Sequence, residues 1–315
     1  MSLAHSLWSR CFQSAEETIR GVGLRRSKFG RSTIAALNTA GRLGVSAYLG
    51  LRTRPVMVQG QQMSCSTWED GSFRSTLELL LDQYEPETTR VFHELLRPGM
   101  RVVDIGAHGG YFSLIAASHV GPNGTVYAFE PFPPSFNALN RNIALNGYQN
   151  IMTIQKAVTS KTERAELIVN SKGSDRHSLY TVDHEEQKEA IKVETIALDD
   201  FLRERDWPRV DLIKMDIEGA EPAALKGMAH SLRNCQIRLL VTEFSPRSLR
   251  AAGFDPYRFL CDLFEAGFSI SILEGEQRPK RLSRDGFSQL VDDLPNRGGT
   301  NLLCENPQFS GGPLS

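Results

Sequence analysis

The chain has 315 residues, of which 40% are hydrophobic and 23% are charged. This composition is ordinary for a globular protein and excludes both a wholly disordered chain and a coiled coil. The five cysteines are widely spaced and form no CxxC pair or Cys/His cluster. We therefore exclude a disulfide scaffold, expect a reducing compartment and predict no metal site.

No apolar stretch approaches the roughly 18 residues that a membrane-spanning helix needs. Arg10, Glu16 and Glu17 interrupt the apolar core that a secretory signal would require. Both observations predict a cytoplasmic protein.

The net charge of −1 conceals an uneven distribution. Residues 1–60 contain nine basic and two acidic residues, which leaves 27 basic and 35 acidic residues in the remainder. The remainder is therefore unsuited to a polyanion, and we predict no nucleic-acid partner. In the basic segment, Leu7, Trp8, Phe12 and Ile19 share one helical face. This face suits a helical lid on the acidic remainder or, as the alternative, a peripheral contact with an anionic membrane.

Residues 1–75 are predicted to form a helical extension that precedes a domain over residues 76–310. The domain opens with an expected helix over 77–96, which ends at Pro98 and Gly99. Strand and helix patterns then alternate, which predicts an α/β fold with a mostly parallel sheet and helices on both faces. The expected strands cover 101–105, 125–129, 150–158, 210–215, 237–242, 268–273 and 300–304, and the expected helices cover 111–119, 136–146, a segment from about residue 222, and 256–266.

The alternation is interrupted between residues 160 and 196. Two extended runs, 165–169 and 191–196, flank a polar stretch that contains His177 and His184. This pattern predicts an inserted β-hairpin. We expect its tip to be solvated, and the alternative is a flap that closes over a substrate.

In such a sheet, ligands bind at the carboxyl ends of the strands, so the residues that follow each strand are the candidates for chemistry. The first strand ends in the loop Asp104-Ile105-Gly106-Ala107-His108-Gly109-Gly110. Glycines there allow a close approach of backbone to ligand, but the spacing DxGxxxG differs from the GxGxxG of a dinucleotide site. The loop therefore favours a ligand without a phosphate and argues against an NAD-dependent oxidoreductase.

Glu130 follows the second strand, 20 residues after Gly110. A carboxylate at this place can accept hydrogen bonds from the two hydroxyls of a ribose. The alternative is an acid that caps the next helix. Together, the loop and Glu130 predict a pocket for a nucleoside with an amino-acid tail, which describes S-adenosyl-L-methionine.

The ordered motifs DIGAHGGYFSLIAA, VYAFEPFP, LNRNIALNG, VETIALDDFL and LIKMDIEGAEPAALKG resemble the FkbM-type S-adenosylmethionine-dependent methyltransferases. The resemblance runs from about Arg101 to Gly227. It implies a class I methyltransferase fold, which is Rossmann-like, and transfer of a methyl group, typically to an oxygen. The candidate cofactor-binding residues are Asp104, Gly106, Ala107, His108, Gly110, Tyr111, Glu130, Pro131 and Ala157.

His108 departs from the family's usual pattern, because an asparagine commonly stands at this place in the loop. A histidine is bulkier and can titrate, and we expect it to structure the loop or line the cofactor rather than to act in catalysis.

The fourth strand is followed by Asp216-Ile217-Glu218-Gly219-Ala220-Glu221, which matches the family's D-x-E-G-x-E run. Methyl transfer to a hydroxyl releases a proton, so a carboxylate within reach assists. We predict Asp216 and Glu218 as catalytic residues. Capping of the following helix is the alternative for Asp216, and metal binding by Glu218, Glu221 and Glu243 is a second alternative.

The resemblance implies a hydroxyl of a sugar, a glycolipid or a secondary metabolite as methyl acceptor. Base methyltransferases often carry an [DNS]-P-P-[FY] run after the fourth strand, and this chain has DIEG there. A nucleic-acid or other N-methyltransferase and a non-catalytic binding protein on the same fold remain the alternatives.

Overall fold

The computed structural model describes residues 55–64, 78–79, 82–170, 177–180, 188–275, 278–294 and 298–309. Residues 1–54 lie outside this part of the chain, so the expected lid or membrane contact of the basic segment stays a prediction. His184 and most of the polar tip before it also lie outside the described residues.

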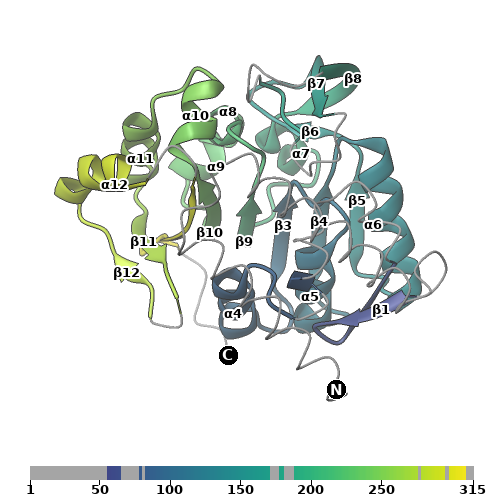
Figure 1. Ribbon diagram of the computed structural model, residues 1–315. Coiled ribbons are helices and arrows are strands. Elements are labelled where there is room, and N and C mark those ends of the chain that lie inside the picture. Colours follow the sequence, from purple (N-terminus) through teal and green to yellow (C-terminus); the bar gives the residue numbers. More distant parts are fainter. Residues whose placement is uncertain are drawn as a thin grey trace, which may run out of the picture.

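A sheet of eight strands forms the centre of the molecule, in the order β12-β11-β13-β10-β9-β3-β4-β5 (Figure 1). The five strands from β10 to β5 run parallel, and β13 joins β10 and β11 in antiparallel pairs. The strands are β3 (Arg101–Ile105), β4 (Thr125–Phe129), β5 (Ile151–Ile154), β9 (Val210–Met215), β10 (Ile237–Phe244), β11 (Ser269–Leu273), β12 (Lys280–Arg281) and β13 (Thr300–Glu305). The predicted α/β fold with a mostly parallel sheet is confirmed.

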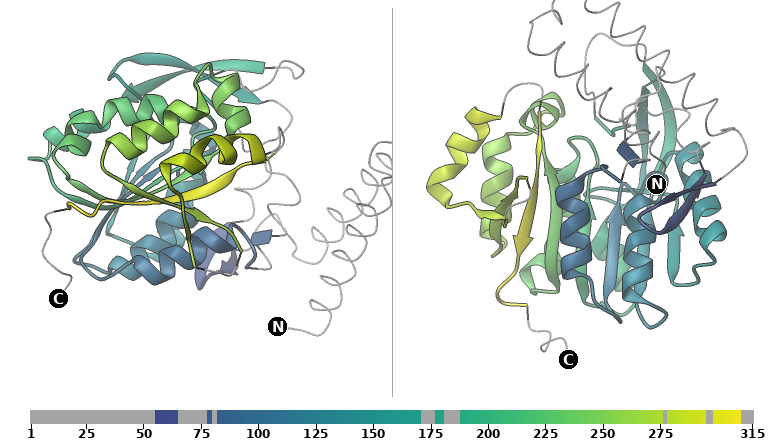
Figure 2. Two further views of the ribbon diagram at one scale, coloured as in Figure 1. Left: turned by 90° about the vertical axis from the view of Figure 1, so that its left-hand side faces the viewer. Right: turned by 60° about the horizontal axis from the view of Figure 1, so that its bottom comes forward.

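Helices cover both faces of the sheet, as predicted. In the left view of Figure 2, the blue helices lie on one side of the strands and the green and yellow helices lie on the other. The first face carries α4 (Pro86–Leu95), α5 (Tyr111–Val120) and α6 (Pro133–Asn146). The second face carries α7 (Leu198–Arg203), α8 (Glu221–Gly227), α9 (Ala229–Arg233), α10 (Pro246–Ala251), α11 (Pro256–Glu265) and α12 (Phe287–Asp293). Neighbouring residues of β3, such as Val102 and Val103, are both fully buried because the strand is covered on both sides.

The helix predicted over 77–96 is interrupted, because Glu78 and Leu79 are helical but residues 82–85 are not. The helix α4 begins at Pro86, and Glu85 before it has a left-handed backbone with φ 39°. A proline disfavours helical geometry in the residue that precedes it, so the apolar periodicity of Leu79 and Leu95 spans two separate segments. This break places Glu85 beside the carboxyl edge of the sheet.

The strand predicted over 150–158 is two strands. The strand β5 ends at Ile154, and β6 (Ala157–Val158) leaves the central sheet to pair with β8. A second sheet of three strands, in the order β6-β8-β7, contains the predicted hairpin as β7 (Arg164–Asn170) and β8 (Lys188–Ile196). The hairpin is therefore confirmed, and it is connected to the edge of the sheet where ligands bind.

Residues 55–64 form a β-hairpin instead of part of a helical extension, so this expectation is wrong for these residues. The strands are β1 (Pro55–Val58) and β2 (Gln61–Ser64), joined by a turn in which Gln59 and Gly60 both have positive φ. Val58 and Met63 are buried in the core beside α5, which is why an alternating pattern here prevails over helix. The proposed boundary at residue 75 therefore does not separate this hairpin from the core.

Within the part of the chain that the structure describes, no helix combines the length and the apolar character that crossing a membrane requires.

Candidate functional site

The tips of β3 and β9 touch where the glycine loop begins. Gly106 has φ +83°, and a Cβ atom on it would lie 2.1 Å from the backbone oxygen of Asp216. The amide of Asp216 in turn donates to the backbone oxygen of Ile105. Only glycine fits this place, so the loop and the D-x-E-G-x-E segment are fixed against each other.

The other end of the loop is fixed against α6. A Cβ atom on Gly110 would lie 2.6 Å from Cδ1 of Leu139, and φ is +92°. His108 between the two glycines also has a positive φ, of 49°. Histidine is among the residues other than glycine that adopt this backbone more often than most, so His108 is compatible with the loop.

Glu130 joins the tip of β4 to the glycine loop. Its Oε2 accepts a hydrogen bond from the backbone N–H of His108 at 2.8 Å, and its Oε1 accepts one from the N–H of Phe132 at 2.9 Å. The side chain is only 5% exposed. Burial raises the pKa of Glu130 to about 7, although the two N–H donors oppose the rise. Glu130 thus holds the loop and titrates near neutral pH.

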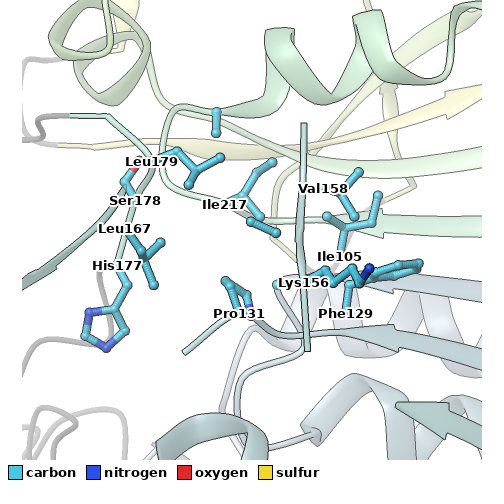
Figure 3. Close-up of a pocket in the computed structure, with 13 residues that line it drawn as sticks. Ile105, Phe129, Pro131, Lys156, Val158, Leu167, His177, Ser178, Leu179 and Ile217 are labelled. Carbon is cyan, nitrogen blue, oxygen red and sulfur yellow. The ribbon is translucent and has the colours of Figure 1, made fainter. Parts of the chain in front are cut away.

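A pocket of about 320 Å³, part of it open to solvent, lies beyond the tips of β3 and β4 (Figure 3). Gly106, Pro131 and Ala157 of the predicted cofactor-binding set line it, together with Lys156 and His177.

Other members of the predicted set lie around the pocket and not in its wall. Asp104 is buried behind the loop. Ala107 and His108 belong to the loop itself. Tyr111 turns towards α4, where its hydroxyl lies 3.0 Å from Oγ1 of Thr89, and is the predicted residue placed least like a ligand contact.

The polar hairpin contributes to the pocket. Ser178 pairs with Ile168 of β7, and its hydroxyl donates to the backbone oxygen of Glu218 at 3.0 Å. The ring of His177 packs on Phe132, with 4.1 Å between the ring centroids. The expectation of a purely solvated tip is therefore wrong for residues 177–180, which connect the hairpin to the acidic segment after β9.

Three carboxylates meet at the tips of β9 and β10. Oxygens of Asp216, Glu218 and Glu243 all lie within 4.8 Å of one another. Burial and the neighbouring charges, that of Asp216 first, raise the pKa of Glu243 well above its ordinary value. We assign no metal to this group, because acids gathered at strand tips also occur without one.

Glu221 does not join these three carboxylates. Its Oε1 accepts from the backbone N–H of Ile217 at 3.0 Å and from that of Gly219 at 3.3 Å. Burial raises its pKa to about 7. Glu221 shapes the turn after β9, so it is not available for the metal site that was considered as an alternative.

Lys214 is a residue of the site that sequence reasoning missed. It lies in β9, is 5% exposed, and its Nζ is 3.0 Å from Oδ2 of Asp216. Nζ also lies 4.6 Å from the centre of the Phe112 ring. Burial alone would lower the pKa of Lys214, but the charges of Asp216, Glu85 and Asp104 outweigh burial and raise it. The available signal was a lysine between apolar residues of a predicted buried strand, in the run LIKM.

Asp104 depends on Lys214 for compensation of its charge. Its Oδ2 accepts from the hydroxyl of Ser113 at 2.6 Å, while its Oδ1 is buried and has no hydrogen-bond partner within the described residues. Burial raises the pKa of Asp104, and the charge of Lys214 opposes the rise.

Lys214→Met should destabilise the fold by about 3–5 kcal/mol at neutral pH, because it leaves buried carboxylates without their cation. The loss should shrink on acidification. The folded-state pKa of Asp104 already exceeds its ordinary value, and it rises further when the opposing charge of Lys214 is removed. In the variant, the folded state therefore binds a proton at Asp104 more tightly than the unfolded state does. The free energy of unfolding consequently increases as the pH falls. Urea unfolding at neutral and acidic pH measures both effects.

Lys156→Met is the matched control, since Lys156 pairs with the exposed Glu194 at 3.0 Å. It should change stability little at either pH. An equal loss of stability for Lys214→Met at both pH values would contradict the compensation of buried charge.

The comparisons with known proteins agree with this geometry. The model of the Methyltransferase FkbM domain matches residues 104–270, which is more than half of the chain. Methyltransferase 1 of Beauveria bassiana is 28% identical over 144 residues, covering 40% of this chain and 57% of its own. Methyltransferase sdnD of Sordaria araneosa is 29% identical over 211 residues, covering 58% of this chain and 78% of its own.

The hexuronic acid methyltransferase AglP of Haloferax volcanii is 24% identical over 174 residues, covering 54% of this chain and 63% of its own. The chain thus spans less than two thirds of two of these three relatives. The family match begins at Asp104 and contains the glycine loop, Glu130 and the acidic segment after β9. On this match, the chain belongs to the FkbM methyltransferase family.

Proposed function

We propose that this protein is an O-methyltransferase whose acceptor is a hydroxyl on a sugar, a glycolipid or a secondary metabolite. The observation that carries the proposal is the glycine loop, pinned between Glu130 and the tip of β9, with carboxylates beside it. The methyl donor of the family is S-adenosyl-L-methionine.

The residues present fit this cofactor. Gly106 of the loop lines the pocket and offers its backbone there without a side chain. The buried Oδ1 of Asp104 has an unused acceptor position within the described residues, which suits an ammonium or a bound water. The pocket beside Pro131 and Ala157 is lined mainly by apolar side chains, which suit packing against a flat ring system.

Glu130 would accept hydrogen bonds from the two ribose hydroxyls. Each of its oxygens accepts one backbone N–H and retains a further lone pair. The same side chain then couples the shape of the loop to the presence of the nucleoside.

Glu130→Gln should weaken binding of S-adenosyl-L-methionine by roughly 30-fold at alkaline pH, since hydrogen bonds to a charged group are worth about 1.5–3 kcal/mol. It should also flatten the pH dependence. The pKa of Glu130 is raised to about 7, so the ionised, better acceptor is gained as the pH rises through that value, and wild-type affinity should rise with it. Calorimetric titrations across this range test the assignment, and an identical pH dependence in the variant would refute it.

The bound cofactor supplies an electrophilic methyl group on a sulfonium. The chain's own carboxylates then have two tasks, to orient the acceptor hydroxyl and to receive its proton. Asp216 is the best placed for the proton, because its side chain is 29% exposed at the carboxyl edge and Lys214 fixes its Oδ2. Glu218 lies beside it in the same group and would orient the acceptor.

One observation argues against a polyanionic acceptor, and one supports a sugar. The carboxylates after β9 and β10 disfavour a polyphosphate or a nucleic acid by like-charge repulsion. One relative is named for methylation of a hexuronic acid, which is a sugar with a carboxyl group.

Asp216→Asn should reduce turnover by about 10²–10⁴-fold, which is the usual contribution of a general base. The affinity for S-adenosyl-L-methionine should change far less, because Asp216 acts on the acceptor. Comparison of single-turnover rates with calorimetric affinities separates the two. Near-normal turnover would reduce Asp216 to a structural residue of the turn.

The direct test of the function is incubation with S-adenosyl-L-methionine carrying a labelled methyl group and a panel of neutral sugars, glycolipids and polyketide-like alcohols. We expect label on a hydroxyl oxygen of at least one acceptor. Label only on nitrogen acceptors would replace the proposal by N-methylation. Binding of the cofactor without transfer to any acceptor would favour a binding protein.

A further inference from the structure

The glycine loop is supported from its far side by the N-terminal hairpin, through one side chain. Asn142 of α6 is completely buried. Its Nδ2 donates to the backbone oxygen of Gly109 at 2.8 Å, and its Oδ1 accepts from the backbone N–H of Ser64 at 2.8 Å. A single amide therefore bridges the loop and strand β2, although their residues are far apart in the sequence.

Only an amide makes both bonds. The oxygen of Gly109 can only accept, and the N–H of Ser64 can only donate, so the orientation of the Asn142 amide is fixed by its two partners. A carboxylate would present two acceptors and leave the oxygen of Gly109 buried against a negative charge. An apolar side chain would leave both backbone groups without this partner, which is costly in a buried place.

The loop is thus fixed at three consecutive residues by two elements, the tip of β4 and α6. Glu130 of the β4 tip holds the N–H of His108, and Leu139 of α6 closes the space at Gly110. Asn142 holds Gly109 between them. Of these three contacts, that of Asn142 is the one that continues to β2.

A neighbouring residue anchors the same hairpin without touching the loop. Asn146, one turn further along α6, accepts from the N–H of Gln62 at 2.7 Å and donates to its oxygen at 2.7 Å. Its Nδ2 also donates to the backbone oxygen of Asn142. Asn146 therefore provides a matched comparison, because it shares the hairpin contact and lacks the contact with Gly109.

We propose that Asn142 is a positioning residue for the methyl donor, which acts by holding the backbone oxygen of Gly109 in the glycine loop. The proposal rests on the proposed function in that the glycine loop is taken as the place where the donor binds.

The test is calorimetric titration of the full-length protein with S-adenosyl-L-methionine and with S-adenosylhomocysteine. Asn142→Asp and Asn142→Ala should each raise the Kd about tenfold, the effect of losing one buried hydrogen bond that orders the loop. Asn146→Ala should loosen the hairpin and leave the Kd unchanged. Thermal unfolding of each variant confirms that the titrations are made on folded protein. It also shows whether the change in Kd is independent of the change in Tm.

Acidification provides a second readout that a general loss of stability would not give. In Asn142→Asp, protonation of the introduced carboxyl restores a donor towards Gly109, so the ratio of variant to wild-type Kd should fall as the pH is lowered. In Asn142→Ala, the ratio should stay constant. Glu130, which titrates near the loop, is present in all variants, so its contribution cancels in the ratio.

Two results would overturn the inference. Unchanged affinity in both Asn142 variants would show that the bridge does not act on the cofactor. An equal loss of affinity in Asn146→Ala would assign the effect to anchoring of the hairpin in general. A wild-type protein that binds neither ligand would overturn the proposed function itself, which is a different result from variants that bind as well as a competent wild type.

Discussion

The contact between Gly106 and the backbone of Asp216 is the constraint on which the site depends. A side chain at Gly106 would place a Cβ 2.1 Å from the oxygen of Asp216, so the tips of β3 and β9 can meet only across a glycine. This contact brings the cofactor loop and the acidic segment together. On the proposed function, this contact joins the pocket for the donor and the carboxylates for the acceptor into one site.

Charge is distributed around this contact so that most of the acids have a defined partner. Lys214 compensates Asp104 and Asp216 from inside the sheet. Glu130 and Glu221 are bound by backbone N–H groups of the two loops that they shape. The acids at the edge therefore fall into two kinds, those that build the loops and those, such as Glu218, that lie together at the tips of β9 and β10.

Sequence reasoning predicted the central strands well, because runs such as RVVDI and VDLIKM are buried on both faces and end in glycines or acids. It failed at Pro86, where the effect of proline on the preceding residue prevailed over the helical periodicity. It also failed at residues 55–64, where a short alternating pattern was taken as part of a helical segment. The contacts that hold the site residues in place were the least predictable part of the structure. Neither the bridge made by Asn142 nor the compensation by Lys214 follows from spacing, since both depend on contacts between residues distant in the chain.

A crystal structure of the full-length protein with S-adenosylhomocysteine tests the central claim most directly. The account predicts the adenosine in the pocket beside Pro131 and Ala157, with both ribose hydroxyls donating to the carboxylate of Glu130. It also predicts the amino-acid tail along the glycine loop that begins at Gly106. A ligand bound elsewhere, or bound here with Glu130 contacting only the backbone of His108 and Phe132, would contradict it.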